Sequence, residues 1–160
     1  MAPDEPTLLV PSVFDRLTDP DPEGYQWRHG YSLDDLAAAV QRDLEALLNT
    51  SMTHPRLPEV FVQTRKSVFA YGLPEVITRR LSDPEEQLSI ARVLENTIRL
   101  FEPRLDDVVA EPVPGSDGGG VAKLRFRVRA RLVVAGDIAY DTVLELTTGR
   151  CHVRPSSEMA

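Results

Sequence analysis

The stretch Phe101-Glu102-Pro103-Arg104-Leu105 lies where a helical pattern of apolar residues stops and a strand-like pattern begins. Proline cannot continue a helix interior, and it pushes the residue before it towards an extended conformation. The chain therefore carries an acid and a base, Glu102 and Arg104, on stiff backbone at a junction between two elements. Charges held in this way either lock the fold or bind a partner, and the residues alone leave both interpretations open.

The residues before this junction are predicted to be helical. Apolar residues recur at helical spacing over 33–48, after a variant of the capping box formed by Ser32 and Asp35. A second helical pattern over 88–101 follows the capping-box sequence Ser82-Asp83-Pro84-Glu85, in which the proline fits the first turn. Between them, the segment 60–73 is mixed, and the pattern does not decide between a short extended segment and a helical turn.

The residues after the junction are predicted to form strands. Apolar and basic residues alternate over 122–134, which indicates a long strand with one buried and one charged face. The alternation resumes over 138–146, and we expect a three-residue turn at Ala135-Gly136-Asp137 that pairs Val134 with Ile138.

Helices followed by an antiparallel meander predict an α+β fold, with the N-terminal helices on one face of a small, mainly antiparallel C-terminal sheet. We expect a single domain over residues 32–154, followed by a tail at 155–160. Residues 1–31 are rich in Pro, Asp and Glu and are predicted to form an N-terminal arm with a short helix near residues 12–18.

Composition narrows the class of protein. The chain has 160 residues and a net charge of −7, which argues mildly against a nucleic-acid-binding protein. No apolar run approaches the roughly 20 residues needed to cross a bilayer, and Met1–Glu5 do not begin a secretory signal. Cys151 is the single cysteine and cannot form an internal disulfide. We therefore expect a cytoplasmic protein without direct membrane insertion.

The charged face of the long strand is the first candidate binding surface. It has three interpretations: a solvated face partly neutralised by acids on the next strand, a protein-docking face, or a nucleic-acid-binding face. The third lacks interleaved aromatic residues and conflicts with the net charge. The basic residues of this face are Lys123, Arg125, Arg127, Arg129 and Arg131.

Evidence for catalysis or cofactor binding is weak. The histidines His29, His54 and His152 have no metal-ligand spacing with one another or with Cys151, and we expect no metal and no cofactor. Glu102 with Asp106 or Asp107 is the one candidate carboxylate pair for a glycosidase. Arg104 would favour an ionised Glu102, whereas a general acid has to carry a proton. We therefore expect no catalytic residues.

Four strings in the chain together resemble the baseplate wedge subunits of bacterial type VI secretion systems, the TssE family. These subunits belong to the contractile-tail wedge proteins that are often labelled lysozyme-like. The strings occur in family order, and each is weak alone but specific in combination. One departure is Glu75, where the family usually has Asp. The strings are Pro11-Ser12-Val13-Phe14-Asp15-Arg16-Leu17, Arg42-Asp43-Leu44-Glu45-Ala46-Leu47-Leu48-Asn49, Ser67-Val68-Phe69-Ala70-Tyr71-Gly72-Leu73-Pro74 and Ile98-Arg99-Leu100-Phe101-Glu102-Pro103-Arg104-Leu105.

The resemblance implies a non-enzymatic structural subunit of a contractile baseplate. Its partners would be the other wedge subunits and the first ring of sheath, with the spike hub nearby, and its strands would offer an edge to the sheath. Glu102, Pro103 and Arg104 would contact the wedge, and we assign Arg125, Arg127, Arg129 and Arg131 to partner binding beside them. The alternatives are a peptidoglycan hydrolase acting through Glu102 and, with less support, a nucleic-acid-binding domain.

Overall fold

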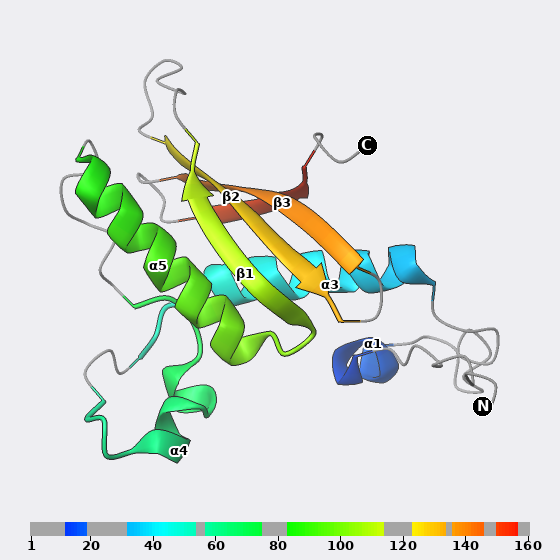
Figure 1. Cartoon of the computed structure of the whole chain (residues 1–160). Coiled ribbons are helices and arrows are strands. Elements are labelled where there is room, and N and C mark those ends of the chain that lie inside the picture. The colour runs from blue at the N-terminus through cyan, green and yellow to red at the C-terminus, as the bar shows by residue number, and fades with distance from the viewer. Residues whose placement is uncertain are drawn as a thin grey trace, which may run out of the picture. The chain divides into compact units, whose positions relative to one another are not determined.

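A computed structural model describes residues 12–18, 32–53, 57–74, 83–113, 123–133, 136–145 and 150–156. Helices come first along the chain and strands follow (Figure 1). The chain divides into two compact units, Met1–Val40 and Gln41–Ala160, and the boundary falls inside the long helix α3. The elements are α1 (Val13–Thr18), α3 (Leu33–Leu48), α4 (Val62–Arg65), the 3₁₀ helix η1 (Val68–Ala70), α5 (Pro84–Phe101), β1 (Leu105–Pro112), β2 (Lys123–Leu132), β3 (Gly136–Glu145) and β4 (Arg150–Pro155).

The helix starts follow the capping signals in the sequence. Ser32 accepts a hydrogen bond from the Asp35 amide, and Asp35 accepts one from the Ser32 amide, so the predicted capping box closes. The N-cap of α5 lies one residue later than predicted. Asp83, and not Ser82, directly precedes the helix, and its side chain accepts a hydrogen bond from the Glu85 N–H. Pro84 therefore occupies the first helical position, where its missing N–H costs nothing.

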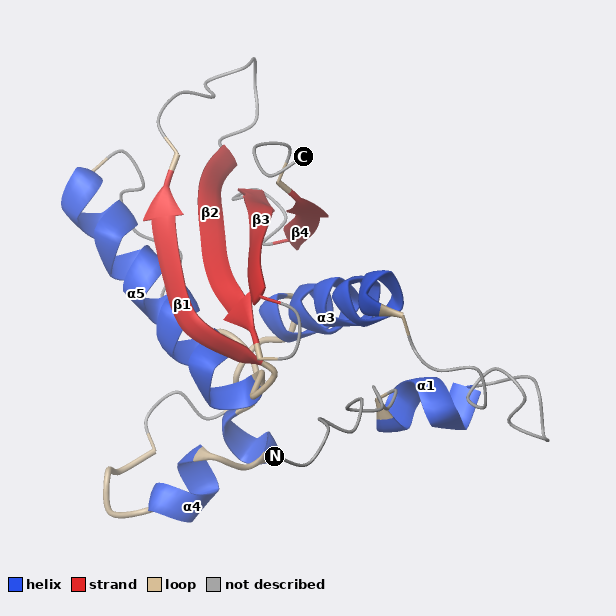
Figure 2. Cartoon of the chain, turned by 45° about the vertical axis from the view of Figure 1, so that its right-hand side comes forward, coloured by secondary structure: helices blue, strands red, loops and turns tan. Residues whose placement is uncertain are grey.

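The four strands form one antiparallel sheet in the order β1-β2-β3-β4, and α5 runs beside β1 (Figure 2). This arrangement confirms the predicted α+β class. The core of the Gln41–Ala160 unit comes from the inward faces of the helices and strands. Its largest fully buried side chains include Leu44, Leu94, Ile98, Val108, Phe126, Val128, Leu132 and Val153.

The hairpin between β2 and β3 keeps its predicted faces but not its predicted register. Leu132 pairs with Gly136 and Val128 with Tyr140, so the three residues between the strands are 133–135 and not 135–137. Pairing Val134 with Ile138 would have placed Leu132 opposite Tyr140, so the register has shifted by four residues, and an even shift in register leaves every side chain on its expected face. Alternation alone could not separate these two registers.

A bulge in β1 keeps an acid out of the core. The pairing shifts between Asp106 and Val109, and Asp107 has a positive φ of 51°. The extra residue reverses the alternation, so that Leu105 and Val108 are both buried while Asp107 is exposed. The carboxylate of Asp107 instead lies 2.8 Å from Arg131 Nη2 on the neighbouring strand.

The outer edge of β4 is covered by side chains from the C-terminal half of α3. The amide of Asn49 accepts from the Cys151 N–H at 2.9 Å and donates to the Cys151 carbonyl at 2.8 Å, as a paired strand would. At Val153, the N–H donates to Glu45 and the carbonyl accepts from Gln41. One face of a helix therefore replaces a fifth strand.

The outer edge of β1 is covered in the same way by α5. Arg99 donates to the Val108 carbonyl, and Glu95 accepts from the Ala110 N–H at 2.9 Å. The family resemblance led us to expect an edge open to strand addition. At the Val108 carbonyl, the Ala110 N–H and both backbone groups of Cys151 and Val153, helix side chains already occupy the positions that an added strand would use.

We predict that Asn49→Ala destabilises the fold by about 1–3 kcal/mol, because it leaves the Cys151 N–H and carbonyl buried without partners. Urea unfolding measures the loss, and hydrogen exchange should show a less protected Cys151 amide. The matched control is Asn96→Ala at an exposed position of α5, which should not destabilise. Equal effects of the two substitutions would contradict this role of Asn49.

Gly72 joins the segment after η1 to the end of α3. Its φ is +107°, and a Cβ at this position would lie 2.3 Å from the Thr50 carbonyl oxygen. The close approach allows the Leu73 N–H to donate to Thr50 and its carbonyl to accept from Met52. Only glycine meets both requirements.

We predict that Gly72→Ala destabilises the protein more than Gly136→Ala. Gly136 also has a positive φ, +99°, but nothing lies within 4 Å of a Cβ there. Gly136→Ala should therefore cost only the backbone strain, about 1–2 kcal/mol, while Gly72→Ala adds a clash with Thr50. Thermal and urea unfolding of both variants test the order, and an equal loss would show that the Thr50 contact relaxes freely.

Candidate functional site

The Glu-Pro-Arg motif forms an ion pair at the junction between α5 and β1. Arg104 Nε donates to Glu102 Oε1 at 2.6 Å, and Arg104 Nη2 donates to Glu102 Oε2 at 2.5 Å. The contact is bidentate, the strongest geometry for arginine and carboxylate. The side chain of Glu102 is only 6% exposed, whereas that of Arg104 is 28% exposed. Glu102 thus holds Arg104 from the protein side, and part of the Arg104 side chain reaches the surface.

A second acid completes the cluster from α3. Asp43 Oδ2 accepts from Arg104 Nη2 at 2.7 Å, and Asp43 Oδ1 accepts from Arg42 Nη2 at 2.9 Å. The cluster therefore alternates in charge, Arg42, Asp43, Arg104, Glu102, and is neutral overall. A buried acid in such a chain is compensated, which removes most of the cost of keeping it out of water.

The backbone around the motif is fixed as well. The Glu102 N–H donates to the Ile98 carbonyl and closes α5, while the Glu102 carbonyl accepts from Leu105 at the start of β1. The Arg104 carbonyl accepts from the Val133 N–H just beyond β2. Hydrogen bonds and ion pairs of three residues therefore join α3, α5, β1 and the end of β2.

Electrostatics around the cluster agree with this geometry. The hydrogen bond to Glu102 raises the pKa of Arg104, so the guanidinium stays charged at any pH at which the protein folds. Burial, assisted by Asp43 and Glu102, raises the pKa of the Tyr71 hydroxyl. Burial raises the pKa of Tyr140 to about 12, with Arg104 opposing and Glu102 adding to the shift. Both tyrosines are therefore neutral neighbours of the cluster.

This arrangement suits recognition better than hydrolysis. Both oxygens of Glu102 already accept hydrogen bonds from Arg104, whereas a glycosidase acid has to reach the substrate and donate a proton to it. What the site offers outward is an exposed Pro103 and the partly exposed guanidinium of Arg104. The structure brings Glu102, Pro103 and Arg104 together, and whether they bind a partner stays a prediction.

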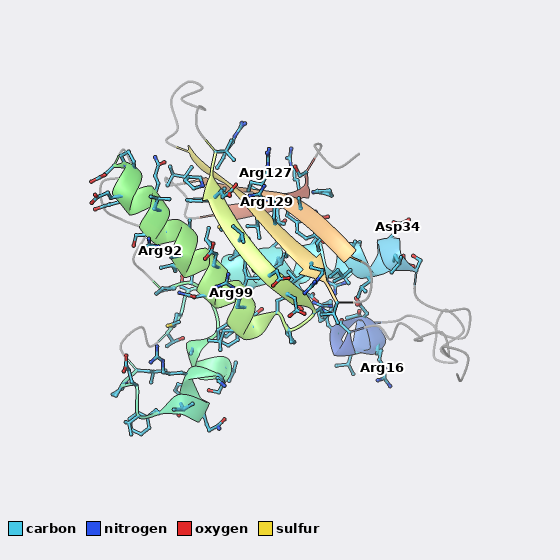
Figure 3. The ribbon with its side chains drawn as sticks, in the orientation of Figure 1. Arg16, Asp34, Arg92, Arg99, Arg127 and Arg129 are labelled. Atoms are coloured by element: carbon cyan, nitrogen blue, oxygen red, sulfur yellow. The ribbon has the colours of Figure 1, made fainter. Side chains whose placement is uncertain are left out.

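The basic residues of β2 lie on the outward face, as the alternation predicts. Arg125, Arg129 and Arg131 are exposed and Arg127 is half-buried, with Arg127 and Arg129 following one another along the strand (Figure 3). Arg129 pairs with Glu111 at 2.6 Å and Arg131 with Asp107 at 2.8 Å. The acids that neutralise these two arginines thus come from β1, while the sequence pointed to β3. The motif and this basic face are separate surfaces along the chain.

Sequence reasoning missed three residues that matter here. Asp43 and Glu45 lie between the apolar positions of the helical pattern over 33–48, and Asn49 directly follows it, so the pattern assigns them no contact. In the structure Asp43 binds Arg104, and Glu45 and Asn49 bind β4. The sequence pointed to them in one way only: all three belong to the string Arg42–Asn49, which carries part of the family resemblance.

The described residues contain no group of three His, Cys, Asp or Glu side chains that could hold a metal ion. His152 is described, and its Nδ1 lies 3.7 Å from Glu45 Oε1; His29 and His54 fall outside the described ranges. Cys151 is fully buried, and burial raises the pKa of its thiol to about 12. Among the described helices, none has the length and apolar character that a membrane span requires.

The fold and the motif together define a structural α+β domain built around an internal charge cluster. The family model of the baseplate wedge protein gp25 matches residues 34–137, which contain the cluster and the strands β1 and β2. The chain therefore belongs to this family of baseplate wedge proteins, structural components of contractile tails. No curated protein sequence and no solved structure gives a significant match.

We predict that Arg104→Met destabilises the protein by about 3–5 kcal/mol, because the buried carboxylate of Glu102 loses its partner. The matched control is Arg129→Met, which breaks an exposed pair with Glu111 and should cost less than about 1 kcal/mol. Urea unfolding measures both.

A double variant, Glu102→Leu with Arg104→Met, separates the cost of an unpaired buried charge from the cost of changed side-chain packing. It should recover much of the stability lost in Arg104→Met, because no unpaired carboxylate stays buried at position 102. An Arg104→Met variant as stable as Arg129→Met would show that the cluster is not a fold lock.

Proposed function

We propose that this chain is a non-enzymatic wedge subunit of a type VI secretion baseplate, and that it links neighbouring wedge subunits to the first ring of contractile sheath. The observation that carries the proposal is the intact Glu-Pro-Arg motif inside the span that matches the baseplate wedge family. The subunit would act in the cytoplasm.

The wedge contact is assigned to Pro103 and the exposed part of Arg104. Glu102 and Asp43 orient the guanidinium, so little side-chain entropy is left to lose when a partner binds. The remaining guanidinium nitrogen, Nη1, can donate to a partner carboxylate or to backbone carbonyls. The motif is then both a fold lock and a binding group, because its two charges have different exposures.

The sheath contact is assigned to the basic face of β2. Arg125 is exposed and forms no ion pair with any residue in the described part of the chain, so it is the first group available to a partner acid. The exposed pairs of Arg129 and Arg131 contribute little stability and can be exchanged for contacts with a partner. Strand addition at Cys151 or Val153 would first have to displace Asn49, Glu45 and Gln41.

We predict that Arg125→Glu reduces sheath assembly without changing the stability of the isolated chain. The reversed charge would repel the acidic groups that the basic face is proposed to meet, and an exposed substitution leaves the core intact. Fluorescently labelled sheath, counted in cells that carry the variant in place of the wild type, gives the measurement. The control is Arg92→Glu on α5, an exposed arginine outside this face (Figure 3).

Two results would contradict the proposal, the first as a whole and the second only in its sheath contact. Normal sheath formation and secretion in cells that lack the chain would remove the baseplate role. Normal sheath counts with Arg125→Glu would leave that role standing and move the sheath contact away from the basic face.

A further inference from the structure

The segment from Val60 to Phe69 turns its large apolar side chains outward. Each is between 53% and 83% exposed, and α4 buries none of its residues. Within this stretch and η1, the buried residue is Ala70. Figures 1 and 2 show α4 standing away from the sheet. We call this surface the α4–η1 patch; its apolar residues are Val60, Phe61, Val62, Val68 and Phe69.

The patch is held in shape although it buries almost nothing. Ser67 caps η1 by accepting from the Phe69 N–H, and its hydroxyl donates to the Thr64 carbonyl at 2.7 Å. α4 and η1 contact one another, which brings the exposed apolar residues of the two turns near each other. Single exposed apolar residues are ordinary, but a contiguous group on a shaped turn marks an interaction site.

The charged residues of the α4–η1 patch indicate what kind of partner it binds. Arg65 and Lys66 are exposed within the patch, and in the described ranges neither forms an ion pair. With Glu59 the segment carries a charge of +1, while the whole chain carries −7. The complement of this surface is an apolar face bordered by carboxylates. An anionic membrane fits less well, because the net charge of the chain would be repelled by it.

We propose that the α4–η1 patch binds an acidic amphipathic helix of another baseplate subunit. The patch presents side chains from helical turns and no open backbone edge, so a helix laid on it gains apolar anchors at spacings of three and four residues. Arg65 and Lys66 then meet acids on the rim of that helix. This inference rests on the proposed baseplate function and adds a third contact surface to the Glu-Pro-Arg motif and the basic face of β2.

Photocrosslinking tests the location. A benzoylphenylalanine replaces Phe61 or Phe69 in the full chain, which is assembled with the wedge subunits of its own system. The expected product is a crosslink to a helical segment of another subunit that carries an apolar face and more acids than bases. The control places the same group at Leu88, an exposed apolar residue of α5 outside the patch, and should not yield that crosslink.

Charge reversal tests the chemistry. Arg65→Glu should weaken binding of the chain to the crosslinked subunit by about tenfold or more, and should reduce the dependence of that affinity on salt. Arg92→Glu introduces the same charge change on α5 and should bind as the wild type does. Both positions are exposed, so unfolding midpoints should stay unchanged.

Three outcomes overturn the inference. The first is a crosslink to a second copy of this chain or to a basic segment. The second is binding to phosphatidylglycerol vesicles that requires the patch. The third is a wedge complex that forms while positions 61 and 69 yield no crosslink. If the wild-type chain enters no wedge complex, the proposed function fails as well. If the complex forms with its contacts elsewhere, only the patch assignment fails.

Discussion

The contact of Arg104 with Glu102 and Asp43 is the interaction on which the rest of the structure depends. It places a bidentate ion pair on a nearly buried carboxylate at the point where α5 ends and β1 begins. Asp43 extends the same cluster to α3, and the backbone of Arg104 reaches the residue after β2. Because a buried acid without its partner is costly, these elements have to meet in one arrangement.

The sheet shows the same use of helix side chains. Asn49, Glu45 and Gln41 bond the outer edge of β4, and Glu95 and Arg99 bond that of β1. A four-stranded sheet with exposed edges invites uncontrolled pairing. Helix side chains protect these edges and leave the basic face of β2 and the α4–η1 patch as accessible surfaces.

The charge cluster and the protected sheet edges both suit a baseplate protein. A wedge protein has to present rigid contacts to several neighbours, and a charge cluster that joins four elements supplies that rigidity. The lysozyme-like label attached to such proteins finds no support in Glu102, because its two oxygens accept from Arg104. The same residue that would have been the catalytic acid instead orients an arginine towards the surface.

The sequence by itself determined the α+β class, the helix start at Ser32, the end of α5 at Phe101 and the two faces of β2. Each of these depends on local periodicity, capping or proline, which act between residues close in the chain. Only the tertiary structure decided the hairpin register, the bulge at Asp107 and the roles of Asp43 and Asn49. Those features depend on partners far away in sequence, and alternation is unchanged when a strand shifts by two residues.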